Sequence, residues 1–141
     1  MAVIIGIGNA ALYIVHLVDC YPDENAEIRC HSRTLRCGGN TANTLIVLSQ
    51  LGPSCRWAGM LADNAEGDLV AAELIRHGID ISASEFSDQG SMPVSTIMIS
   101  RQTGSRTITH YRDLPEYSYA AFSAIDLEAL DWLHFEGRNI D

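Results

Sequence analysis

The stretch that decides the fold runs from residue 36 to residue 43: Arg36-Cys37-Gly38-Gly39-Asn40-Thr41-Ala42-Asn43. Apolar residues follow it at helical spacing and Gly52-Pro53 supplies a stop, which predicts a buried helix that Asn40 can cap. The two glycines let a ligand approach the backbone, and the helix start leaves amide groups free. Asn40 and Asn43 lie one turn apart, and neutral amides of this kind suit the hydroxyl groups of a small ligand. A glycine turn with a helix cap would explain the glycines and Asn40, but it leaves Asn43 unexplained.

The segments after this helix repeat the alternation of strand and helix. Residues 56–61 form a short apolar stretch typical of a buried strand. Asp63-Asn64-Ala65-Glu66 then resembles a capping box, and an apolar face continues from there to His77-Gly78. Strand followed by helix, twice over, is typical of an α/β domain with a parallel sheet.

Two apolar segments precede the glycine stretch, at residues 3–7 and 12–18, and both are rich in Ile and Val. Between them, Gly6-Ile7-Gly8-Asn9-Ala10-Ala11 fits a relaxed dinucleotide-binding fingerprint if Ala11 replaces the third glycine. That motif requires a helix to begin here. Residues 12–18 favour a strand instead, so a tight connection between two strands is preferred, and a Rossmann dinucleotide-binding domain is the distant alternative.

The rest of the chain favours short strands. Residues 27–36 alternate loosely like an exposed strand pair, and residues 94–100 and 105–111 predict a hairpin with a Gly-containing loop. A helical turn at 126–130 and a strand at 132–135 follow. Because an α/β domain should continue into another helix at this point, we expect the 141 residues to be the front half of a longer domain.

Composition limits the classes of partner. The formal net charge is −9 and all nine basic residues are Arg, so mechanisms that need a lysine amine are excluded. The acidic balance argues against nucleic acid or a membrane surface as partner, and no apolar run approaches the roughly 20 residues that span a bilayer. We expect a cytoplasmic protein with reduced thiols and no resident metal. A site at Cys30, His31 and Cys37 is a weak metal alternative, and the scattered histidines (His16, His77, His110, His134) lack a nucleophile partner.

With the segment 48–52, residues 38–43 resemble the sugar-binding motif of the ribokinase-like (PfkB) carbohydrate kinases. Residues 19–22, 27–29, 104–108 and 132–139 are most similar to the ketohexokinase (fructokinase) branch and its bacterial relatives. The resemblance covers essentially the whole chain, in order. It implies an α/β, three-layer sandwich with a mostly parallel sheet and a small β-clasp lid.

The resemblance also implies an activity: transfer of the γ-phosphoryl of ATP, with Mg²⁺, to a sugar hydroxyl, with a ketohexose such as fructose as the expected substrate. Core residues would be 1–26, 37–92 and 112–141, and lid strands 27–36 and 93–111, the lid often forming a homodimer interface. Gly39, Asn40 and Asn43 would hold sugar hydroxyls, and Arg106 on the lid would reach the transferred charge. Gly38 and Glu136 are second-tier candidates for the same cleft.

Two departures from the family pattern follow from the resemblance. Tyr13 stands where the family usually has a sugar-binding Asp, so one hydroxyl remains while the bidentate acceptor is lost and a ring enters the sugar space. The family's Gly-Ala-Gly-Asp motif, which supplies the catalytic base and anion hole in the C-terminal half with the nucleotide site, does not occur. We therefore expect this polypeptide to be inactive alone. The alternative from another class is a sugar-binding or regulatory module that has lost the chemistry.

Overall fold

A computed structural model describes residues 1–137. The strands are β1 (Val3–Ile7), β2 (Ala11–Val18), β3 (Ser32–Gly38), β4 (Ser54–Ala58), β5 (Met60–Ala62), β6 (Glu85–Ser87), β7 (Val94–Ser100), β8 (Arg106–Tyr111) and β9 (Trp132–Phe135). The helices are α1 (Asn40–Gln50), α2 (Ala65–Arg76) and α3 (Tyr119–Ser123). Arg138 and Asn139, the last two residues of the segment 132–139 that resembles the family, lie outside the described residues. Most strand pairs are parallel, so the chain is a mixed α/β protein as expected.

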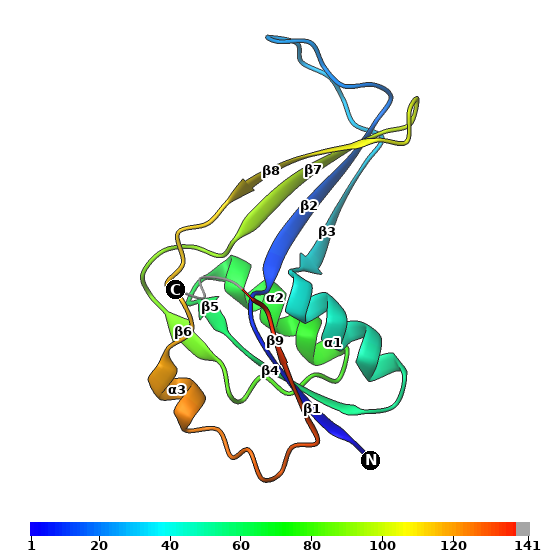
Figure 1. Ribbon diagram of the computed structural model, residues 1–141. Coiled ribbons are helices and arrows are strands. Elements are labelled where there is room, and N and C mark those ends of the chain that lie inside the picture. Colours follow the sequence, from blue (N-terminus) through cyan, green and yellow to red (C-terminus); the bar gives the residue numbers. More distant parts are fainter. Residues whose placement is uncertain (138–141) are drawn as a thin grey trace.

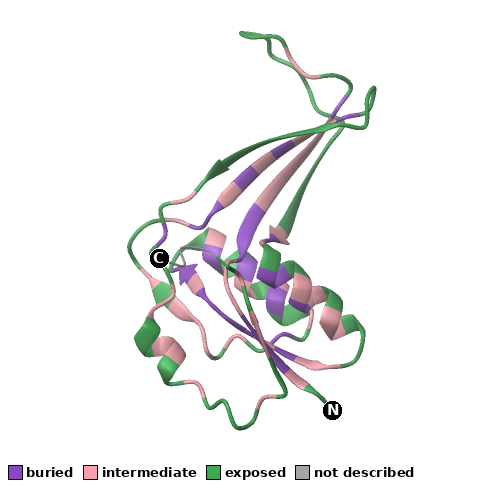
Figure 2. Cartoon of the chain, viewed as in Figure 1, coloured by how far each residue is buried: buried purple, intermediate pink, exposed green. Residues whose placement is uncertain are grey.

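The body of the molecule is built on a parallel sheet with the strand order β4-β1-β9. β1 is the central strand of this sheet, and its Ile5 side chain is fully buried. A strand in a parallel sheet whose faces are covered needs no alternation of apolar and polar residues. Leu45 of α1, Trp57 of β4 and Leu74 of α2 belong to one buried cluster. Figure 1 shows α1 and α2 lying beside this sheet, and Figure 2 shows the buried residues concentrated there. The carboxyl ends of β1 and β9 lie beside the start of α1, where Gly8 and Glu136 approach Thr41.

A second sheet, with the order β3-β2-β7-β8, projects away from the body (Figure 1). We call it the lid sheet. β2 pairs with β7 in parallel, and β3 and β8 flank them antiparallel. Residues 11–18, expected in the core as part of 1–26, form a central strand of the lid sheet. An Ile- and Val-rich run suits a central strand of either sheet, so its composition does not distinguish the two.

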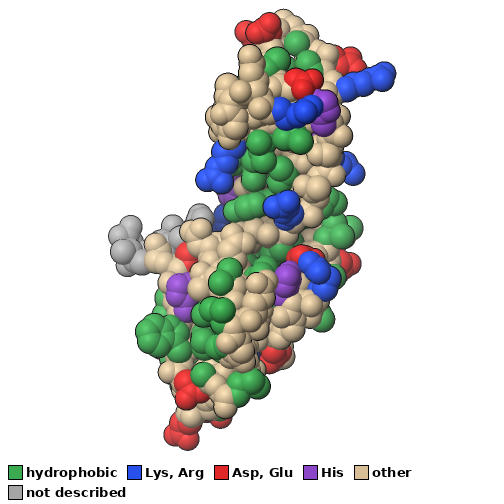
Figure 3. All heavy atoms as spheres, turned by 90° about the vertical axis from the view of Figure 1, so that its right-hand side faces the viewer, with side chains coloured by type: hydrophobic (Ala, Val, Ile, Leu, Met, Phe, Trp, Pro, Cys, Tyr) green, Lys and Arg blue, Asp and Glu red, His purple; other side chains and the backbone are tan. Residues whose placement is uncertain are grey.

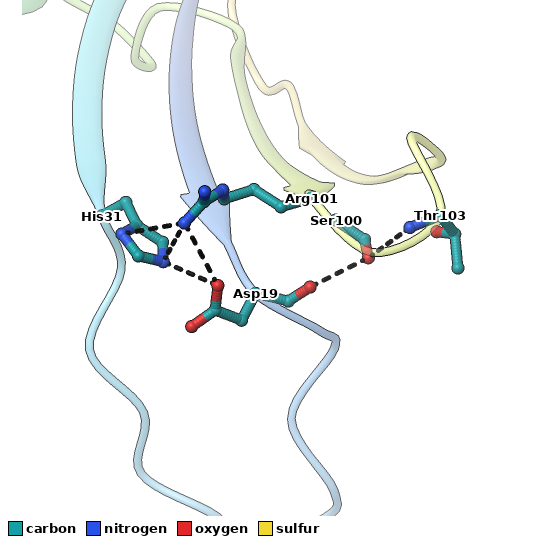
Figure 4. A network of polar contacts seen from close by, with 5 residues as sticks. All are labelled: Asp19, His31, Ser100, Arg101 and Thr103. Carbon is teal, nitrogen blue, oxygen red and sulfur yellow. Dashed lines mark hydrogen bonds and ion pairs between the residues drawn. The ribbon is translucent and has the colours of Figure 1, made fainter.

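The outer end of the lid sheet is held by a polar cluster that joins two loops (Figure 4). Asp19, directly after β2, accepts a hydrogen bond from His31 at 2.7 Å and lies 3.4 Å from the guanidinium of Arg101. Arg101 lies in the β7–β8 turn, so the cluster ties that turn to the irregular segment 19–31. Only one strand, β3, forms where a strand pair was expected at 27–36, and it starts at Ser32.

Other local expectations need correction. The helical turn expected at 126–130 is a single turn, in which the Leu130 N–H donates to the Leu127 carbonyl at 3.2 Å. The short helix α3 lies earlier, where the Ser118 hydroxyl accepts the N–H of Ala121. The N-cap of α1 is Gly39 and not Asn40, which is the first helical residue. In contrast, Asn64 caps α2 through the N–H of Gly67. The start of α1 thus has no side-chain cap of its own.

Candidate sugar-binding site at the root of the lid sheet

A pocket of about 120 Å³ lies where the lid sheet meets the body. Its body side consists of residues beside the starts of β2 and α1 and after β9: Asn9, Ala11, Gly39, Asn40 and Glu136. Its lid side consists of residues at the inner ends of β2, β7 and β8: Tyr13, Pro93, Ser95, His110 and Arg112. Four of the sequence-predicted residues, Tyr13, Gly39, Asn40 and Glu136, are brought together here.

The two glycines before α1 are needed for different reasons. Gly39 has φ 101° and ψ 140°, a conformation that L side chains rarely adopt, and an added Cβ would overlap the Asn9 carbonyl oxygen. Gly38 is covered by the ring of Tyr13, which a Cβ at residue 38 would overlap. The Tyr13 hydroxyl accepts the N–H of Gly39 at 3.3 Å. The ring of Tyr13 therefore lies across the glycine turn and occupies part of the space beside the helix start.

Glu136 occupies the amino end of α1. Its carboxylate accepts the backbone N–H of Asn9 at 2.9 Å, the Thr41 hydroxyl at 3.3 Å and the Asn40 side-chain amide at 3.4 Å. A carboxylate is favoured there because the helix start leaves N–H groups unpaired and carries partial positive charge. The three hydrogen bonds go to the Asn9 backbone and to two side chains of the first turn, so Glu136 stabilises the helix start through its charge and fixes Asn40 at the pocket. Glu136, a second-tier candidate from the sequence, lies at the pocket wall. Gly38, the other second-tier candidate, lies behind the Tyr13 ring.

The lid side contributes residues that the sequence reasoning missed. Ser95 and His110 are cross-strand partners on β7 and β8, and the buried Ser95 hydroxyl lies 2.8 Å from His110 Nδ1. Arg112 follows β8, and its guanidinium contacts Asn9 Oδ1 at 3.4 Å and pairs with Glu116 at 3.0 Å. His110 is one of the scattered histidines for which the sequence indicates no nucleophile partner, and the structure places it beside the Ser95 hydroxyl, 15 residues away in the chain. The hairpin register was the signal that could have paired them.

Besides Gly38, two predicted residues, Asn43 and Arg106, do not line this pocket. Asn43 is exposed, one turn into α1, and does not line it. Arg106 pairs with Ile99, whereas His110 pairs with Ser95. It therefore lies four residues farther out along β8, roughly 13 Å away at strand spacing. The helix turn sets the position of Asn43, and the strand register sets that of Arg106. Neither can be read from the spacing of residues in the sequence.

The alternatives for a cofactor or metal find no support among residues 1–137. After Gly8 the chain enters β2 and no helix begins, so the dinucleotide motif lacks its helix and that alternative is wrong. No three or more His, Cys, Asp or Glu residues of the described chain are grouped so as to hold a metal ion. Burial and then the charge of Glu73 raise the pKa of the Cys37 thiol to about 12, which disfavours a thiolate ligand. Within the described part, no helix is long and apolar enough to cross a bilayer.

Comparisons with known proteins identify the class and then the family. Thermotoga maritima ribokinase has a TM-score of 0.71 at 19% identity, covering 94% of this chain and 44% of that one. Arabidopsis thaliana ribokinase, solved with ribose and ATP, has a TM-score of 0.69 at 21% identity, covering 79% and 36%. The fold is thus that of the ribokinase-like proteins.

Residues 1–140 match the pfkB family of carbohydrate kinases, and the chain belongs to this family. It is 38% identical to mouse ketohexokinase over 137 residues, which is 96% of this chain and 46% of the relative. The chain therefore spans less than half the length of that relative.

Proposed function

We propose that this chain is the sugar-binding part and lid of a carbohydrate kinase that transfers the γ-phosphoryl of ATP to a sugar hydroxyl. The observation that carries the proposal is the pocket at the lid root, where the family's glycine-asparagine motif meets a helix start. A ketohexose such as fructose is the proposed substrate, and the similarity to ketohexokinase supports that choice.

Binding in the pocket would rest on neutral hydrogen bonds to sugar hydroxyls. The Asn40 side-chain amide lies at the pocket, and the Tyr13 hydroxyl, which accepts from Gly39, keeps its own proton to donate. Glu136 would hold the helix start and Asn40 in place through the three contacts described above. These residues are proposed to bind and orient the sugar.

The reacting groups would come from a portion of the protein that corresponds to the remaining length of the relatives. Mg²⁺, ATP and the catalytic base are proposed to belong to that portion. Asn43 and Arg106 would act in the complete enzyme, Arg106 after the lid sheet closes toward the body. This chain alone is proposed to be inactive.

The lid sheet is also proposed as a homodimer interface in a cytoplasmic enzyme. Leu35 and Ile108 on its strands are each 46% exposed, and Figure 3 shows hydrophobic side chains along the projecting part between basic ones. Light scattering tests this proposal, and a monomer at micromolar concentration would contradict it.

Two measurements test the function. Isothermal calorimetry of this chain should show saturable sugar binding, and ADP release with sugar, ATP and Mg²⁺ should stay at background. Coding sequence beyond residue 141 that contains Gly-Ala-Gly-Asp would support the kinase. A genuine stop together with sugar binding would favour the alternative, a binding module without chemistry, for which Tyr13 in the pocket is the specific observation. Turnover by this chain alone would refute the proposal that the catalytic base and the ATP site belong to another portion of the protein.

A further inference from the structure

The lid side of the pocket carries a hydrogen-bonded pair of side chains, Ser95 of β7 and His110 of β8. The two residues are cross-strand partners, and the Ser95 hydroxyl lies 2.8 Å from Nδ1 of the His110 ring. Ser95 is 6% exposed, whereas His110 is exposed, and both line the pocket. Because Ser95 engages Nδ1, the polar atom of this ring that remains for a ligand is Nε2.

The Ser95 hydroxyl determines which ring nitrogen carries the proton. Among residues 1–137 this hydroxyl has one hydrogen-bond partner, Nδ1 of His110. A buried hydroxyl whose proton finds no acceptor is costly, so donation from Ser95 to Nδ1 is favoured. The ring proton of the neutral imidazole is then on Nε2. In the opposite tautomer Nδ1 would donate, and the proton of the buried hydroxyl would be left without an acceptor.

The body side of the pocket offers the complementary group. The Asn40 side-chain nitrogen donates to Glu136 at 3.4 Å, which leaves the amide oxygen of Asn40 as an acceptor at the pocket. A ligand between the two sides therefore meets an N–H donor on the lid and a carbonyl acceptor on the body. An alcohol hydroxyl can accept from the first and donate to the second, whereas a group that only accepts satisfies one of them.

The charged groups of the pocket are already paired, which suits a neutral ligand. Arg112 pairs with Glu116 at 3.0 Å, and the Glu136 carboxylate accepts three hydrogen bonds beside the start of α1. Two residues farther out on the same face of the hairpin, the cross-strand pair is apolar, Ile97 with Ile108. The polar pair of the hairpin on this face is thus confined to the level of the pocket.

We propose that His110 is a specificity-determining residue of the sugar site, whose Nε2–H donates to a sugar hydroxyl that in turn donates to the Asn40 amide oxygen. Ser95 is a positioning residue, because it holds the ring in the donating tautomer without contacting the sugar itself. The inference rests on the sugar-binding function proposed above and keeps its neutral ketose. It adds that one hydroxyl of the sugar joins the lid sheet to the body.

The tautomer is measured first, on the intact chain without ligand. Long-range proton–nitrogen NMR spectra of the imidazole rings distinguish a proton on Nε2 from one on Nδ1. At mildly alkaline pH the His110 ring should carry its proton on Nε2. Ser95→Ala should give exchange between both tautomers, and Ser95→Thr, which keeps a hydroxyl, should restore the single one. A proton on Nδ1 in the unmodified chain would overturn the role of Ser95, whether or not a sugar binds.

The contact with the sugar is measured by calorimetry with D-fructose and its monodeoxy analogues. His110→Phe should bind D-fructose about three- to tenfold more weakly than the unmodified chain, the range expected for one uncharged hydrogen bond. One deoxy analogue should show the same loss with the unmodified chain and no further loss with His110→Phe. His16→Phe is the matched control, because His16 of β2 lies outside the pocket, and it should bind D-fructose as the unmodified chain does.

The remaining outcomes separate this inference from the proposed function. Unchanged affinity in His110→Phe, or a loss that adds to the loss of every deoxy analogue, refutes the contact with His110 and leaves sugar binding standing. Circular dichroism checks folding, and His110→Leu, for which the same losses are expected, replaces His110→Phe if that variant unfolds. If the unmodified chain shows no saturable binding of D-fructose at tens of millimolar, the proposed function fails and the contact fails with it.

Discussion

The contact between Gly38 and the Tyr13 ring can be measured through the substitution Gly38→Ala. A Cβ at residue 38 would overlap ring atoms of Tyr13, so the ring or β3 must move. Overpacking of this kind costs about 1–3 kcal/mol. Unlike Gly39, Gly38 has no positive φ, so alanine meets no backbone strain there. Once the ring is removed, Gly38→Ala should be neutral or stabilising by about 0.4–1 kcal/mol through the unfolded chain.

A double-mutant cycle with Tyr13→Ala isolates this contact. Tyr13 is half-buried, so its truncation alone should cost about 1–2 kcal/mol. The double variant should be no less stable than Tyr13→Ala, which corresponds to a coupling energy of about 1–3 kcal/mol. Urea unfolding followed by circular dichroism measures all four proteins. Gly137→Ala is the control, because an added Cβ there meets nothing within 4 Å. Strictly additive losses would show that the ring does not cover the glycine turn.

Three further predictions concern other parts of the chain. Burial and the charge of Glu73 raise the pKa of the Cys37 thiol to about 12. At pH 8 this thiol should therefore react with a thiol reagent far more slowly than the exposed Cys20 and Cys30, and equal rates by peptide mapping would contradict this. Asp19→Asn should loosen the outer lid cluster and speed amide exchange in residues 19–31 several-fold without affecting β1, whereas Asp23→Asn should not; unchanged exchange in Asp19→Asn would refute the role of the cluster. Hydrogen bonds from the backbone and hydroxyl of Ser91 lower the pKa of Asp113, so its stabilising contribution is present at pH 7 and is lost as the pH falls through that lowered value. Asp113→Asn should therefore have a lower Tm than the unmodified chain at pH 7 and a smaller deficit at pH 3, and a deficit that does not change with pH would rule this out.

The sequence predicted the body of the fold because its signals are local. Apolar spacing and glycine stops indicate α1 and α2, with the Asn64 cap as a further signal for α2, and the strands at 3–7 and 132–135 form as expected. Sheet membership was harder to predict, because an apolar run such as residues 12–18 fits any central strand. Pairing of β2 with β7 joins residues about eighty positions apart, and nothing in either segment alone indicates it.

The candidate site was predicted on its body side and missed on its lid side. Gly39 and Asn40 belong to a contiguous motif, and Glu136 follows a strand whose end is clear from the sequence. His110 and Arg112 reach the pocket through the register of the β7–β8 hairpin. A shift of one residue in that register would turn His110 to the opposite face, so sequence spacing alone could not place it. The expectation for Arg106 came from the family resemblance, and its distance along β8 makes any role depend on lid closure.

The central claim is that the pocket at the lid root binds a sugar. The most direct test is an amide NMR titration of the 15.4 kDa chain with D-fructose. Saturable shifts should cluster at Gly39, Asn40, Ser95 and His110. Shifts confined to the Asp19 and Arg101 cluster or to α3, or the lack of any saturable shift, would contradict sugar binding at this pocket.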